Sequence, residues 1–232
     1  MSACPLFGSL RSAAIAAIIC ASVASPALAQ ARRPAPARAQ ARPPALSIAV
    51  SGHAGLHVFA ATESVKAVLD TNSGLMFGGG VDARLRNGLF FGVRLSRFEK
   101  SGSRVFVFNR EVFDLGIPAT IRIRPIETVA GYRLVRRNAR MVPYVAGGIG
   151  WHHYQEESEF ATGDENVDET FRGYHVLGGV EWRASRLIGV AGEAQWTTVP
   201  DALGTNPRSV SAAFGETNLG GYGFRVRVVV GR

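Results

Sequence analysis

The chain has 232 residues, of which 47% are hydrophobic and 19% charged, and its formal net charge is +8. This length suits about one domain, and the composition excludes an intrinsically disordered chain. The mean hydropathy of +0.09 is too low for a bundle of membrane-spanning helices. The basic surplus is uneven, because residues 1–45 contain five arginines and no acidic residue. The charge therefore gives little reason to expect nucleic acid as a partner.

Residues 1–29 are predicted to be a secretory signal peptide. Arg11 precedes an apolar run from Ala13 to Val23, and the small residues Ala27 and Ala29 fit a signal-peptidase cleavage site. The apolar run is shorter than the roughly 20 residues that a membrane-spanning helix needs. We therefore expect this segment to be removed rather than kept as an anchor.

Residues 30–45 are almost entirely Ala, Arg, Pro and Gln. Prolines prevent a helix here, so the segment is predicted to be an extended periplasmic linker. Both cysteines, Cys4 and Cys20, precede it. The mature chain is therefore expected to contain no thiol, which excludes disulfides and cysteine-ligated metals.

The sequence from residue 46 to the end has the period-two pattern of β-strands. In residues 75–85, Leu75 and Phe77 share one face while Asp82 and Arg84 share the other. The Asn-Gly pair that follows predicts a tight hairpin to a strand over 89–95. A change of phase at Pro125 predicts a β-bulge. Further strands are predicted at 46–59, 128–134, 142–154, 171–183, 187–199 and 219–230, giving eight.

The connections between these strands are of two kinds. Tight turns are predicted near Asn87, Asn138 and Ser185, and they alternate with long connections near 60–73, 100–118, 155–169 and 200–216. All long loops therefore fall at one end of the structure. Short turns at one end, long loops at the other and an even strand count are typical of transmembrane β-barrels. The prediction is an all-β, eight-stranded antiparallel up-and-down barrel over residues 46–232, with both termini periplasmic.

The polar faces of the strands mix glycines with charges of both signs, which suits a narrow barrel interior. Charges kept from bulk water must pair, so we expect an interior ion-pair network that plugs the lumen. Its predicted members are Asp82, Arg84, Arg94, Glu127, Arg133, Glu181, Arg183, Glu193, Arg225 and Arg227.

The opposite faces are predicted to carry aromatic girdles at the two lipid interfaces. The predicted girdle residues are Tyr144, Tyr154, Tyr174, Trp182, Trp196 and Tyr222. In the strand over 142–154 either face could be the lipid-facing one, because Ala146-Gly147-Gly148 suits both. A soluble β-protein, in which these aromatic residues form an ordinary core, is the alternative.

Two glycine-rich and aromatic strands, Val145–Trp151 and Gly220–Val226, carry a resemblance to a known family. With the signal peptide and the hairpin pattern, residues 46–230 resemble the small outer-membrane barrels of the outer-membrane protein A, X and W type. The resemblance implies an integral outer-membrane protein whose partners are membrane lipid and the barrel-assembly machinery. The chain departs from this pattern at its end, Val228–Arg232, where such barrels commonly finish with an aromatic residue.

Eight strands enclose an interior that their own side chains fill, so an open porin channel is not expected. We predict a non-enzymatic protein with a structural or surface-interaction role and with no cofactor, metal or catalytic residue. His53, His57 and His175 are predicted to face inward. A lipid-modifying barrel enzyme that uses them is therefore an alternative function. A small-solute channel and a soluble periplasmic binding barrel also stay open as functions.

The loop over 155–170 contains seven carboxylates and no basic residue. Carboxylate oxygens are the ligands that Ca²⁺ and Mg²⁺ prefer, although the spacing does not follow an EF-hand. The loop is therefore a candidate site for divalent cations, with an ordinary solvated loop as the alternative.

Overall fold

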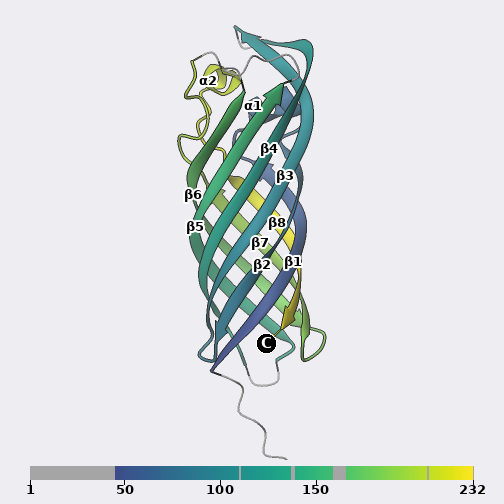
Figure 1. Ribbon diagram of the computed structural model, residues 1–232, viewed down its shortest axis with the longest axis vertical. Helices are drawn as coiled ribbons and strands as arrows, with labels where there is room; N and C mark the ends of the chain where they lie inside the picture. Colours follow the sequence, from purple (N-terminus) through teal and green to yellow (C-terminus); the bar gives the residue numbers. More distant parts are fainter. Residues whose placement is uncertain (1–44, 110, 137–138, 159–165, 208, 232) are drawn as a thin grey trace, which may run out of the picture. The chain divides into compact units, whose positions relative to one another are not determined.

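The computed structural model describes residues 45–231 except 110, 137–138, 159–165 and 208. The predicted signal peptide and linker, apart from Ala45, lie outside the described residues. Within them, eight antiparallel strands pair in sequence order and β1 pairs with β8, which confirms the predicted closed barrel (Figure 1). The strands are β1 (Leu46–Phe59), β2 (Ser73–Leu85), β3 (Leu89–Phe108), β4 (Glu111–Arg133), β5 (Met141–Ser158), β6 (Val167–Arg183), β7 (Ile188–Thr198) and β8 (Gly221–Gly231).

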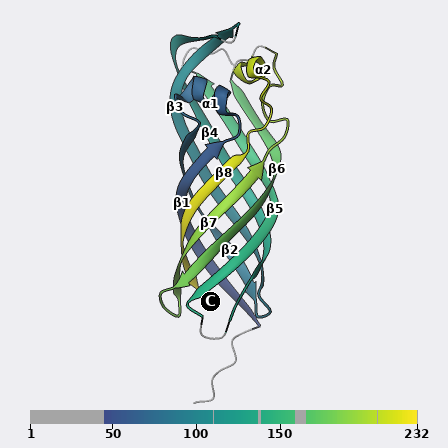
Figure 2. The same ribbon diagram turned by 180° about the vertical axis from the view of Figure 1, so that it is seen from behind.

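The two ends of the barrel differ in their connections. At one end, which we call the turn end, β2 and β3 are joined by a tight turn in which Asn87 accepts a hydrogen bond from the Leu89 N–H (3.1 Å). Gly88 provides the positive φ of this turn (98°). At the other end, the loop end, two helices follow β1 and β7: α1 (Thr62–Leu69) and α2 (Val210–Phe214) (Figure 2). Among the described residues, neither helix is long and apolar enough to cross a membrane.

The outside of the barrel is apolar over most of its height. On β5, Met141, Val145, Ile149 and Trp151 point outward and are exposed. Ten residue steps from Met141 to Trp151, at the strand rise and tilt usual in such barrels, span roughly 25 Å. A monomeric soluble protein rarely exposes so large an apolar surface, so this band favours lipid rather than water as the medium around the barrel.

The polarity of the two faces reverses near the loop end. On β4, Glu127 points inward and Ile126 outward. Nearer the loop end, Ile123 is buried inside and Arg124 is exposed outside. The inward and outward alternation continues through Pro125, which pairs with His152. The bulge predicted at Pro125 was therefore wrong, because the interior changes from polar to apolar while the backbone phase stays the same. The register shift in this hairpin lies instead between Arg104 and Val105.

The loop predicted over 100–118 was also wrong. Strands β3 and β4 remain paired through this region, with Phe106 opposite Phe113 and Phe108 opposite Glu111. β4 pairs with β5 only from Ala119 onward. The hairpin therefore projects from the loop end as a two-stranded ribbon, and Phe106, Phe108 and Phe113 are exposed on it. The polar residues that suggested a loop occupy positions on two paired strands that extend beyond the pairing of β4 with β5.

An apolar cluster fills the barrel at the loop end. Phe59, Phe98 and Ile123 from the strands pack with Val65 and Leu69 of α1. Helix α1 has no side-chain cap of its own at Ala61. The carboxylate of Glu216 instead accepts hydrogen bonds from the backbone N–H groups of Glu63 (3.0 Å) and Ser64 (2.8 Å) and from the Ser64 hydroxyl. The first and last loops are thereby joined into a lid over the lumen.

Close approach between β4 and β5 requires glycine at position 148. A Cβ at Gly148 would lie 1.8 Å from the backbone oxygen of Thr128, whereas a Cβ at the outward Gly192 would meet no atom within 4 Å. We expect Gly148→Ala to lower the free energy of unfolding by about 1–3 kcal/mol, the usual cost of overpacking. Gly192→Ala is the matched control and should leave it unchanged. Urea unfolding in detergent micelles measures both, and equal effects would contradict the register.

Candidate functional site

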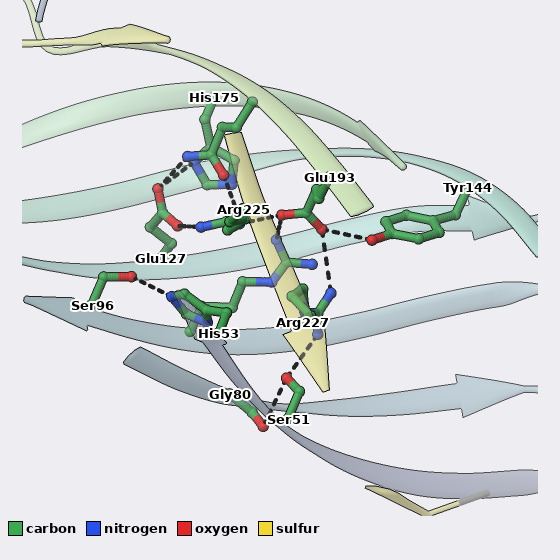
Figure 3. Close-up of polar contacts among 12 residues, drawn as sticks. Ser51, His53, Gly80, Ser96, Glu127, Tyr144, His175, Glu193, Arg225 and Arg227 are labelled. Carbon is green, nitrogen blue, oxygen red and sulfur yellow. Dashed lines mark hydrogen bonds and ion pairs between the residues drawn. The ribbon is translucent and has the colours of Figure 1, made fainter. Parts of the chain in front are cut away.

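Glu193 on β7 is the centre of a charged network inside the barrel. Its carboxylate accepts hydrogen bonds from Arg94 (2.8 Å), Arg227 (3.3 Å) and the Tyr144 hydroxyl (3.0 Å). It also bonds Arg225, which lies beside it on β8 (Figure 3). The side chains of Arg94 and Glu193 are both 0% exposed. Three guanidinium groups thus share one fully buried carboxylate.

The network continues toward the turn end. Arg227 also pairs with Asp82 (2.9 Å), which lies 3.7 Å from Arg84. Arg84 in turn pairs with Glu181 at 3.1 Å. Glu181 then contacts two further arginines at the turn end, Arg133 at 2.9 Å and Arg183 at 3.8 Å.

In the other direction the network reaches the middle of the barrel. Arg225 lies 3.7 Å from Glu127, which is also 3.7 Å from Nδ1 of His175. The amide of Gln195 donates to Glu127 (2.6 Å) and to the hydroxyl of Thr197 (2.9 Å). All ten residues predicted as the interior network are therefore connected by ion pairs of 4 Å or less, from Arg183 near one end to Glu127.

A cavity separates this network from the apolar lid. Phe59, Ile123 and Leu219 line its upper part, while His57 and Gln195 line the part next to the network. About 40 Å³ of it is open to the centre of a water molecule. Because one water needs roughly 10–15 Å³ on this measure, the cavity has room for about three. Packed apolar side chains thus lie on one side of this cavity and paired charges on the other.

The inward histidines do not form a complete catalytic set. Nε2 of His53 lies 3.0 Å from the hydroxyl of Ser96, but its Nδ1 has no hydrogen-bond partner among the described residues. His57 packs edge-on against Phe59, with 4.7 Å between ring centroids. A hydrolase triad needs a third group to orient the histidine. Across the residues that the structure describes, no three His, Cys, Asp or Glu side chains are placed to hold a metal ion.

The structure divides the predicted girdle residues. Tyr174, Trp182, Trp196 and Tyr222 point outward and are 44–57% exposed. Tyr144 and Tyr154 are inside the barrel at 7% exposure each, so their assignment to a girdle was wrong. The two tyrosines were assigned to the wrong face because the glycine-rich centre of β5 gives its two faces the same polarity in the sequence. Among the tyrosines and tryptophans, two outward residues were missed, Tyr132 and Trp151.

Four of the seven carboxylates predicted as a cation site belong to described residues. Glu156 accepts a hydrogen bond from Tyr154 (2.9 Å) and Glu157 pairs with Arg122 (2.6 Å). Asp168 accepts one from Gln155 (2.9 Å). Glu159, Asp164 and Glu165 lie outside the described residues. Cation binding at this loop stays a prediction.

Comparison with known proteins shows likeness in fold. A major outer membrane protein from Thermus thermophilus matches with a TM-score of 0.51 and 10% identity, over 80% of this chain and 99% of that one. The N-terminal β-barrel domain of Pseudomonas aeruginosa OprF matches with a TM-score of 0.48 and 10% identity, over 80% and 97%. Neisserial surface protein A matches with 0.45 and 15%, over 80% and 95%. No protein-family model and no curated protein sequence matches the chain. The chain thus has the fold of an eight-stranded outer-membrane barrel.

Neutralising Glu193 should destabilise the barrel. In Glu193→Gln, the guanidinium groups of Arg94, Arg225 and Arg227 lose their shared carboxylate while staying buried. Breaking a buried ion pair from one side costs about 3–5 kcal/mol, and we expect a loss of that size in the free energy of unfolding. Urea unfolding in micelles measures it.

Glu99→Gln is the matched control, because Glu99 pairs with Arg97 and Arg122 on the exposed part of the barrel. Exposed pairs contribute little, so its unfolding midpoint should stay close to that of the unchanged protein. Equal midpoints for the two variants would show that the network adds no stability.

Proposed function

We propose that this chain is a non-enzymatic, integral outer-membrane barrel with a structural or surface-interaction role and a lumen that is closed to solutes. The fold supports the coarse part of this proposal, since strands can span a bilayer only when the barrel closes and satisfies every backbone group. The apolar outer band supports it as well, because its height of roughly 25 Å matches that of the lipid-facing band in such barrels.

The proposal that the lumen is closed to solutes rests on the continuous ion-pair network across it. Each ion pair joins side chains from different strands or from alternate positions on one strand, and this arrangement across the lumen at several levels supports the proposal. An ion entering from the turn end would have to separate Arg133 from Glu181 and then Arg94 from Glu193. Separating such buried charges is costly, since each would be left without a partner in a low-dielectric interior.

The asymmetry of the ends supports an orientation. In outer-membrane barrels, short turns face the periplasm and longer loops face outward. On this rule the turn end and the chain termini are periplasmic, and the lid and the ribbon of β3 and β4 are outside. The exposed phenylalanines of the ribbon lie beyond the apolar band, and they favour a surface-interaction role over a purely structural one.

Fractionation combined with gel mobility tests the location. We expect the mature chain in the outer-membrane fraction, and we expect unboiled protein in detergent to migrate differently from boiled protein, because a closed barrel stays folded until it is heated. The control is the same protein unfolded in urea before loading, which should show one mobility. Soluble protein with no heat-dependent shift would contradict the proposal.

Conductance across a planar lipid bilayer tests closure. The folded protein should produce no steady current above that of the bare bilayer. Glu216→Gln, which weakens the bond between the lid loops, should behave in the same way because the ion pairs below remain. Incorporation is checked by recovering heat-shifted barrel from the same membrane. A steady current from the unmodified protein would show that the lumen is an open path.

A further inference from the structure

A row of basic side chains lies on the outer surface just above the apolar band. Arg124 on β4 pairs with His153 on β5, and Arg172 on β6 pairs with Trp151. Arg97 on β3 lies beside Arg124, since its neighbours Leu95 and Phe98 pair with Ile126 and Ile123. Neighbouring strands are about 4.8 Å apart and the two positions are offset by two residues along β5, so the backbones of Arg124 and Arg172 lie about 12 Å apart.

Two of these arginines have no partner among the described residues. Arg97 hydrogen-bonds Glu99, and His153 lies 3.1 Å from the Thr170 hydroxyl and 3.4 Å from Asp168. Arg124 and Arg172 are exposed, and neither makes a hydrogen bond or ion pair with another described residue. Two unpaired positive charges on the same outer surface, separated only by β5, favour an anion bound between them.

The carboxylates nearest to the row, further toward the loop end, are already engaged. Arg122 pairs with Glu99 (3.5 Å) and with Glu157 (2.6 Å). Asp168 is held by Gln155 and His153. None of these acids therefore pairs with Arg124 or Arg172.

The height of the row indicates which anion it meets. Arg172 shares its level with Trp151 and is two residues from Tyr174, and both aromatic residues are exposed on the outside. Tryptophan and tyrosine gather at the level of lipid headgroups. A guanidinium at that level faces the phosphate of a lipid, to which it donates two parallel hydrogen bonds.

We propose that Arg124 and Arg172 bind the phosphate of an anionic lipid in the leaflet around the loop end, with Trp151 and Tyr174 against its acyl chains. This site rests on the proposed function, because it requires that the apolar band lies in a bilayer. The lipid is recognised by its phosphate charge and by its position at the membrane surface, so a phosphate free in solution is a poor competitor.

Binding of lipid A, a diphosphorylated glycolipid, to the full mature chain in detergent tests the site by native mass spectrometry. We expect one retained lipid A per barrel. In the double variant Arg124→Gln with Arg172→Gln, affinity should fall about 30-fold, since each basic residue near a membrane surface contributes about 1 kcal/mol. The corresponding double lysine variant should keep most of the binding.

Three controls separate the sources of binding. Arg86→Gln removes an exposed arginine at the turn end and should bind like the unmodified protein. Lipid A with its phosphates removed should bind as weakly as the double glutamine variant does. Inorganic phosphate in large excess should not displace lipid A. Displacement would assign the site to free phosphate and overturn the proposal that it binds a lipid.

Equal binding by the double glutamine variant, or by the dephosphorylated lipid, would overturn the site while leaving the barrel proposal intact. Insertion into vesicles of phosphatidylcholine alone tests that proposal separately, because this lipid has no net charge. Failure to insert, with no heat-dependent gel shift, would overturn the proposed function and the lipid site together. Each variant is first shown to be heat-shifted, so a loss of binding cannot come from unfolding.

Discussion

The medium on each side of the barrel wall decides where every side chain can lie. Over the apolar band the outward side chains are apolar, and the charged side chains of the network point into the lumen. There they find partners among themselves, as in the pairs around Glu193 and Glu181. Beyond the band, the same alternation places Ile123 inside and Arg124 outside. A strand such as β4 therefore has a polar inner face within the band and an apolar inner face near the loop end, with no change in its inward and outward alternation.

The interior is not electrically balanced. The ten residues of the network are six arginines and four carboxylates, which leaves a formal surplus of two positive charges. The positive surplus is concentrated around Glu193, because Arg94, Arg225 and Arg227 all reach this one carboxylate. Tyr144 donates to the same carboxylate and separates it from the apolar residues Phe90 and Leu177 nearby. The lumen therefore depends on a few shared carboxylates rather than on independent pairs.

Most of the fold follows from patterns that the sequence carries locally. Alternation and turn residues predicted the strands, their order and the closed ring, and the same alternation indicated that Asp82 and Arg94 point inward. The phase of β5 could not be read, because Ala146-Gly147-Gly148 has no polar side, and Tyr144 and Tyr154 were misplaced. The ribbon beyond Ala119 was missed because Val105–Phe108 is apolar on both faces, so this part of the strand lacks the alternation of apolar and polar residues. The bond from Glu216 to α1 joins residues more than 150 positions apart, and no local signal predicts it.

The position of Arg225 and Arg227 on the last strand has a consequence for assembly. β8 pairs with β1 across the seam of the ring, and Arg227 joins Asp82 while Arg225 joins Glu193 and Glu127. Pairing the two ends of the chain is the contact of greatest sequence separation, and such contacts form slowly. Until β8 docks, Glu193 keeps only Arg94, Asp82 keeps only Arg84, and Glu127 has no arginine partner among the described residues. Closing the seam therefore also completes the ion pairs that link Asp82, Glu193 and Glu127 into one network.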